Sequence, residues 1–150
     1  MDQINQVQAQ RVWQRVRGSE TVAPERSLDA LIAAEWEDAA TYLQLSKHFS
    51  GRERQLLHKL HEQELAHCSC LKGICSITSG SKPQLPTPDP VHGPIDQILR
   101  SCYGRKMRAM SAYDARCQDP EYGCVFTKLR DQEQEHCRII LELIGSLSRK

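Results

Sequence analysis

SITSGSKPQLPTPDPVHGP, residues 76–94, separates two halves of the chain and decides how they are arranged. The segment is rich in Pro, Ser and Gly, and this composition predicts a connection without regular secondary structure. Extended at about 3.3 Å per residue it reaches about 60 Å, whereas a helix of twenty-odd residues is only about 33 Å long. The segment can therefore run the full length of a helical bundle, so that the helix after it lies parallel to the helix before it.

Each half predicts a pair of helices joined by a short connection. Apolar positions are mostly Leu, Ile and Ala, and only 5% of residues are aromatic, which favours helices over a sandwich or barrel. Ser27 is the expected N-cap of the first helix, Ser50-Gly51 separates the first pair, and Asp119-Pro120 separates the second. Short connections make each pair antiparallel neighbours. The expected helices span about 27–49, 52–77, 95–116 and 122–147, with an inward stripe that includes Leu31, Ile32, Leu43, Leu57, Leu60, Leu129, Ile140 and Leu143.

The N-terminal residues predict a separate short helix. Apolar side chains of residues 3–17 lie on roughly one side of such a helix, and Gly18 ends it. We therefore expect an N-terminal helical appendage over residues 1–24 and an all-α four-helix bundle over residues 25–150. The apolar face of the appendage is suited to packing on the bundle or on the partner in a dimer.

Charge and cysteine content narrow the class of protein. The net charge of +1 comes from interspersed acidic and basic residues, and without a basic stripe nucleic acid is not an expected partner. Neither an apolar signal region nor a membrane-spanning run is found, so we expect a cytoplasmic protein. The seven cysteines form no CxxC pair, which argues against a thiolate zinc site and favours reduced, mostly buried thiols.

Two Glu-x-x-His motifs occupy equivalent places in the two halves. They are Glu64 with His67 and Glu133 with His136, and residues three apart lie on one face of a helix. Di-iron carboxylate bundles use one such motif from each of two helices and a single Glu from each of the other two. Glu35 lies on the inward stripe of the first helix and fits the single-Glu role. Oxygen and imidazole ligands suit iron or manganese better than zinc.

With these residues the sequence resembles the rubrerythrin and ferritin-like superfamily over about residues 27–147. The resemblance rests on Glu35 with Tyr42, the two motifs, and SCYGRKMRAMSAYDAR (101–116), which contains Tyr113. It implies a ferritin-like bundle with one long crossover and up to two metal ions, expected to be iron, with manganese or zinc as alternatives. It further implies ions bridged by Glu64 and Glu133, tyrosines that orient the carboxylates, and a homodimer. The implied activity is peroxide- or oxygen-linked oxidoreductase or ferroxidase chemistry, with electrons from a separate donor protein.

Lys106 departs from the pattern of this superfamily. It stands seven residues before Tyr113, as Glu35 stands seven before Tyr42, and the third helix contains no Glu. Three carboxylates and one ammonium sum to −2, too little to neutralise two adjacent divalent ions in a buried site. We therefore expect one metal site, or one strong and one weak, with the Lys106 ammonium near the second position and paired with Glu133.

Two alternatives stay open from the sequence. Lys106 is a surface residue if the register of the third helix differs from the one assumed. The chain is otherwise a non-enzymatic metal-binding or structural bundle with a degenerate site, so whether it is an enzyme stays undecided at this point.

Overall fold

The computed structural model describes residues 27–149, and this part of the chain contains four α-helices and no strand. The all-α bundle expected from the sequence is confirmed, whereas the expected helix over 3–17 and the 1–24 appendage lie outside the described residues. The helices are α2 (Leu28–Ser46), α3 (Gly51–Ser79), α4 (Ile95–Asp114) and α5 (Gly123–Leu147).

The helix ends differ from the predicted ones by a few residues, for local reasons. Ser27 caps α2 as expected, because its side chain accepts a hydrogen bond from the backbone of Ala30. At the other end of α2 the backbone tightens into a turn of i→i−3 hydrogen bonds, so the helix ends at Ser46. Helix α3 runs on to Ser79 because its left-handed C-cap is Gly80, with φ +69°.

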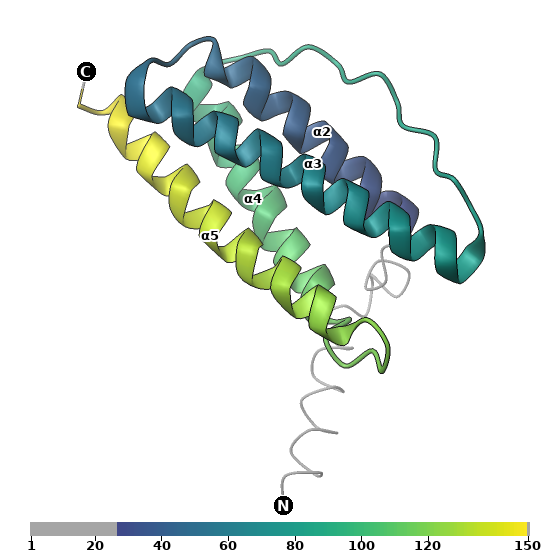
Figure 1. The fold of residues 1–150 in the computed structure, drawn as a ribbon. Helices are drawn as coiled ribbons and strands as arrows, with labels where there is room; N and C mark the ends of the chain where they lie inside the picture. Colours follow the sequence, from purple (N-terminus) through teal and green to yellow (C-terminus); the bar gives the residue numbers. More distant parts are fainter. Residues whose placement is uncertain (1–26, 150) are drawn as a thin grey trace, which may run out of the picture.

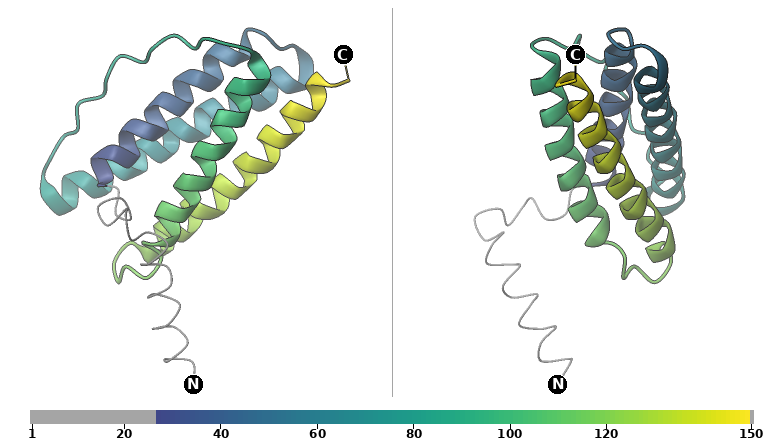
Figure 2. Two further views of the ribbon diagram at one scale, coloured as in Figure 1. Left: turned by 180° about the vertical axis from the view of Figure 1, so that it is seen from behind. Right: turned by 90° about the vertical axis from the view of Figure 1, so that its left-hand side faces the viewer.

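Two antiparallel hairpins make up the bundle, α2 with α3 and α4 with α5 (Figures 1 and 2). The irregular segment 80–94 leaves the end of α3, runs along the outside of the bundle and enters α4 at the opposite end (Figure 1). Helices α3 and α4 therefore run in the same direction, which confirms the long crossover predicted from the sequence.

Polar contacts hold the crossover against α2. The indole N–H of Trp36 donates to the carbonyl of Pro86 at 2.9 Å, and the backbone N–H of Val91 donates to the side chain of Gln44 at 2.7 Å. Leu85 packs against the apolar core beneath. These contacts fix the path of an otherwise irregular segment along α2.

The apolar core is divided into two clusters along the bundle axis. The first contains Leu31, Ile32, Cys68, Leu71, Tyr113, Phe126 and Leu129, and the second contains Tyr42, Leu45, Leu57, Leu60, Leu99, Ile140 and Leu143. On each helix, buried charged residues stand between the members of the two clusters. Leu43 is 40% exposed, so its assignment to the inward stripe is wrong: it lies about 100° around α2 from the buried Tyr42.

The cysteines agree in part with the expectation that they are reduced and mostly buried. None of the seven cysteines forms a disulfide. Four of them, Cys68, Cys75, Cys102 and Cys137, are buried as small apolar side chains. Cys70 and Cys124 are exposed and Cys117 is half-buried, so the expectation of burial fails for these three.

Of the helices between residues 27 and 149, none is sufficiently long and apolar to cross a membrane.

Candidate metal centre

A layer of seven ionisable side chains separates the two apolar clusters, and every one of them is at most 2% exposed. All four helices contribute. The Glu and the His of each Glu-x-x-His motif lie on the same, inward face of their helix. The five ligands predicted from the sequence and Lys106 meet here, together with one residue that was not predicted, Asp38. This polar layer consists of Glu35 and Asp38 from α2, Glu64 and His67 from α3, Lys106 from α4, and Glu133 and His136 from α5.

Lys106 lies at the centre of the polar layer. Its Nζ is 2.9 Å from carboxylate oxygens of Asp38, Glu64 and Glu133, and 3.7 Å from one of Glu35. Burial alone would lower the pKa of Lys106, but the four carboxylates outweigh it and hold that pKa well above its usual value. Lys106 is therefore a permanent buried cation paired with Glu133 as expected, and the surface alternative is wrong.

On one side of Lys106, His67 and three carboxylates form a compact group. Nδ1 of His67 is 3.2 Å from Oε2 of Glu35 and 3.1 Å from Oε1 of Glu133. With an oxygen of Glu64, these ligand atoms lie within 4.8 Å of one another. Neighbouring ligands about 2.1 Å from one metal ion are about 3.0 Å apart, so the spacing suits a single ion.

The imidazole of His67 holds a proton strongly when no metal is bound. Burial works to lower its pKa, but hydrogen bonds to Glu133 and Glu35 and their charges raise the pKa of His67 to about 9. Since a metal ligand must be deprotonated, an ion that binds here displaces this proton.

On the other side, His136 faces Glu64 and Glu133. Its Nδ1 is 2.5 Å from Oε1 of Glu64 and 3.6 Å from Oε2 of Glu133. Nδ1 of His136 and Oε1 of Glu64 make no hydrogen bond within residues 27–149, whereas Oε2 of Glu133 is paired with Nζ of Lys106 at 2.9 Å. Lone pairs of nitrogen and oxygen at this distance repel one another unless a cation lies among them. The unsatisfied atoms therefore fit a metal ion or a proton on the His136 side.

Glu64 and Glu133 have opposite proton affinities. Burial, followed by the adjacent charge of Glu35, raises the pKa of Glu64 well above its usual value. Burial opposes ionisation of Glu133 too, but Lys106 and both histidines outweigh it and hold the pKa of Glu133 below its usual range. Of the two carboxyl groups, Glu133 is therefore held as an anion and Glu64 binds a proton more readily.

A half-buried contact of Asp38 completes the charge balance. Arg105 Nε donates to Asp38 Oδ1 at 2.7 Å, so the polar layer has four carboxylates facing two permanent cations, Arg105 and Lys106. With both imidazoles neutral, two negative charges remain, which one divalent ion neutralises. Sequence reasoning missed Asp38, although it lies three residues after Glu35 on the same helix face.

The two tyrosines expected to orient carboxylates differ. Tyr113 donates to Glu35 at 2.9 Å, whereas the buried hydroxyl of Tyr42 finds no hydrogen-bond partner in the described part of the chain. The two halves repeat, so Tyr42 is equivalent to Tyr113 and Lys106 is equivalent to Glu35. The counterpart of the Tyr113–Glu35 hydrogen bond would therefore join Tyr42 of α2 to position 106 of α4. Lys106 is a donor and offers Tyr42 no acceptor. The expected role of Tyr42 is therefore corrected.

Two glutamines hold the outer edges of the histidines. Nε2 of His67 is 2.6 Å from Oε1 of Gln132, and Nε2 of His136 is 2.7 Å from Oε1 of Gln63. The two imidazole rings are stacked with centroids 5.4 Å apart. Sequence reasoning missed both glutamines, but a signal was present, because the repeated motif is Gln-Glu-x-x-His in both halves.

A cavity of about 370 Å³ between α2 and α4 leads to the polar layer. Glu35 and Asp38 of the layer are among its lining residues, together with several small side chains. The other lining residues include Ala30, Ala33, Ala34, Arg105, Arg108 and Ala109.

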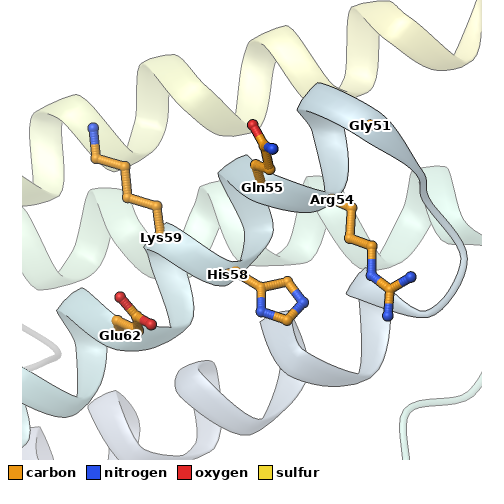
Figure 3. A pocket seen from close by; sticks show the side chains of 6 residues that line it. All are labelled: Gly51, Arg54, Gln55, His58, Lys59 and Glu62. Atoms are coloured by element: carbon orange, nitrogen blue, oxygen red, sulfur yellow. The ribbon is translucent and has the colours of Figure 1, made fainter.

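The remaining histidines do not belong to the layer. Nδ1 of His61 lies 2.7 Å from the carbonyl oxygen of Ala39 in α2. His58 lines a separate surface pocket on the outer face of α3 (Figure 3). That pocket is lined by Gly51, Arg54, Gln55, His58, Lys59 and Glu62, none of which belongs to the polar layer.

The polar layer is thus a buried constellation of carboxylates, imidazoles and one ammonium, placed by all four helices. Its donor set fits one divalent cation beside Lys106. No protein-family model, curated protein or solved structure matches this chain significantly.

Proposed function

We propose that this chain is a rubrerythrin-like, ferritin-like metal-binding protein that holds one divalent ion, iron, beside a built-in cation, Lys106. One observation carries the proposal: buried ligand atoms of Glu35, Glu64, His67 and Glu133 lie within 4.8 Å of one another. Burial of so many acids is costly unless a cation compensates them. The single long crossover between two hairpins supports the ferritin-like assignment.

Iron supplies one-electron exchange with peroxide or oxygen when it is bound, and the chain supplies the surroundings. Tyr113 orients Glu35 through its hydrogen bond, and Glu64 takes up or releases a proton as the charge of the layer changes. The proposed activity is a peroxide- or oxygen-linked oxidoreductase or a ferroxidase, supplied with electrons by a separate donor protein. The expected homodimer and cytoplasmic location stay predictions.

One ion, rather than two, follows from the charges. Lys106 stands where the third-helix carboxylate of a di-iron site is expected, and its Nζ already contacts Glu64 and Glu133 at 2.9 Å. A second divalent ion would lie close to an ammonium in a medium of low dielectric. Manganese and zinc compete for the same oxygen and nitrogen ligands.

A structural, non-enzymatic bundle is the second candidate. The observation that favours it is the contact of Lys106 with three carboxylates at 2.9 Å, because this ammonium neutralises part of the layer without any metal. In that case the layer would serve to fix the register of the four helices.

Metal analysis tests the proposal. Protein purified without added iron and then loaded anaerobically with ferrous iron is expected to hold one tightly bound ion per chain, measured by elemental analysis and anomalous scattering. Lys106→Glu restores a fourth carboxylate ligand position and an acceptor for Tyr42, and is expected to hold two ions. Lys59→Glu, on the exposed face of α3, is the matched control and should stay at one. Two tightly bound ions in the wild type would contradict the role of Lys106.

Peroxide turnover separates the two candidates. We expect the iron-loaded protein to consume hydrogen peroxide in the presence of a generic reductant, and Lys106→Glu to consume it faster. Absence of tight metal binding in both the wild type and Lys106→Glu would favour the structural bundle.

A further inference from the structure

Each histidine of the polar layer is held from its outer edge by a glutamine of the opposite helix. Gln132 of α5 lies 2.6 Å from Nε2 of His67 in α3, and Gln63 of α3 lies 2.7 Å from Nε2 of His136 in α5. The two contacts cross between α3 and α5 and are related by the repeat of the two halves. Both Nδ1 atoms point the other way, towards the carboxylates.

The chemistry of the amide determines where the ring proton lies. The atom of each glutamine that faces the ring is Oε1, which accepts hydrogen bonds and cannot donate them. Nε2 of each histidine must therefore carry a proton. A ring with its lone pair on Nε2 would place two acceptors 2.6–2.7 Å apart, which is repulsive. Nδ1 is left as the atom that faces the carboxylates. In His67 it donates to Glu35 and Glu133 when no ion is bound, and it must give up this proton to share its lone pair with a cation.

The position of the glutamines in the sequence explains the crossing. Gln63 directly precedes Glu64, and Gln132 directly precedes Glu133, so each pair diverges by about 100° around its helix. The glutamate enters the centre, while the glutamine reaches across to the neighbouring helix. One Gln-Glu-x-x-His segment thus supplies a carboxylate, an imidazole and the support for the imidazole of the other segment.

We propose that Gln63 and Gln132 are positioning residues that fix Nδ1 of His136 and His67, respectively, as the atoms presented to a cation between the helices. Partners of this kind keep the ring orientation and raise the basicity of a ligating imidazole. The contribution to metal affinity rests on the proposed function. The placement of the ring proton does not, so the two are tested separately.

Nuclear magnetic resonance of the metal-free protein tests the ring proton. In long-range proton–nitrogen spectra, wild-type His67 and His136 are each expected to show a slowly exchanging Nε2–H. Gln132→Leu is expected to abolish the slow exchange at His67 alone, and Gln63→Leu at His136 alone. Gln132→Glu and Gln63→Glu keep the acceptor oxygen and should restore it. The matched controls Gln55→Leu and Gln134→Leu, at exposed positions of α3 and α5, should change neither resonance.

Titration with cobalt(II) as a probe tests the consequence for the ion. Gln132→Leu is expected to weaken cobalt binding about 10- to 100-fold, and Gln132→Glu to restore it. If Gln132→Leu does not fold, Gln132→Asn takes its place, because it keeps an amide but retracts it from the ring by one methylene. The inference would be overturned if Nε2–H exchange were unchanged in Gln63→Leu and in Gln132→Leu, or in Gln132→Asn where that variant takes its place. If the wild type binds no metal but the Nε2–H protons respond as expected, the proposed function fails and the positioning role stands.

Discussion

Lys106 is the buried ammonium that offsets the carboxylates of the layer in the metal-free protein. Replacing it with Met removes the ammonium but keeps the bulk of the side chain, and leaves four buried carboxylates facing one another. Removing one partner of a buried ion pair costs about 3–5 kcal/mol. We expect Lys106→Met to lower the free energy of unfolding by about this amount, measured by urea denaturation in the presence of a chelator.

Lys59→Met is the control for Lys106→Met, because Lys59 is exposed on α3 and its loss should change stability by less than about 0.5 kcal/mol. A divalent metal ion should recover part of the lost stability of Lys106→Met, since it replaces the missing positive charge. Equal stability of Lys106→Met and Lys59→Met would show that the carboxylates are protonated and need no cation.

Individual residues of the site were predictable to different degrees. The five candidate ligands could be found because a helix places residues three apart on one face, and Lys106 because the halves repeat. Asp38 and the two glutamines were not found. Acids and amides are common on the solvated faces of helices, so their presence in the sequence does not mark them as part of a buried site. Only the packing of α3 against α5 shows what Gln63 and Gln132 contact.

At the scale of the helix, replacing either of two glycines with alanine is expected to change stability in opposite directions. A Cβ added at Gly123, where α5 begins, would lie 2.4 Å from the backbone carbonyl oxygen of Cys117, whereas a Cβ at Gly73 in α3 would meet nothing within 4 Å. Gly123→Ala must therefore shift backbone, and we expect a loss of about 1–3 kcal/mol. Gly73→Ala relieves an exposed glycine inside a helix and should add about 0.5–1 kcal/mol. Thermal unfolding of both variants checks the pair, and a gain in stability for Gly123→Ala would contradict the close approach.

The number, order and pairing of the helices in residues 27–149 could be read from the sequence, but their ends could not. Periodicity of apolar residues identifies a helix over several turns, while its last turn depends on local backbone choices. The left-handed Gly80 lets α3 continue to Ser79, beyond the predicted end at 77. Length alone predicted the path of the crossover, but its contacts with Trp36 and Gln44 required the folded protein.

For the whole molecule, stability without metal should depend on pH through His67. Its pKa is about 6.5 when unfolded and about 9 when folded, so protonation stabilises the fold. This contribution, about 3 kcal/mol, is fully present below about pH 6.5, declines as the pH rises, and is lost above about pH 9. Urea denaturation with a chelator at pH 6 and pH 9 measures it. His67→Gln should flatten the dependence, and His58→Gln, on an exposed position of α3, should not.

Metal binding should show the opposite trend with pH. An ion displaces the proton of His67, so the apparent affinity for cobalt(II) is expected to rise between pH 6.5 and about 9. Affinity independent of pH over this range would mean that His67 is not a ligand.

The length of segment 80–94 also bears on how two copies of the chain can associate. Only this segment joins the two hairpins covalently, and its reach exceeds the length of a helix. A hairpin can therefore leave its own chain and take the equivalent place in another copy, a domain swap that recreates every native contact between hairpins. In such an intertwined pair, each layer of acids would be closed by a lysine from the other molecule.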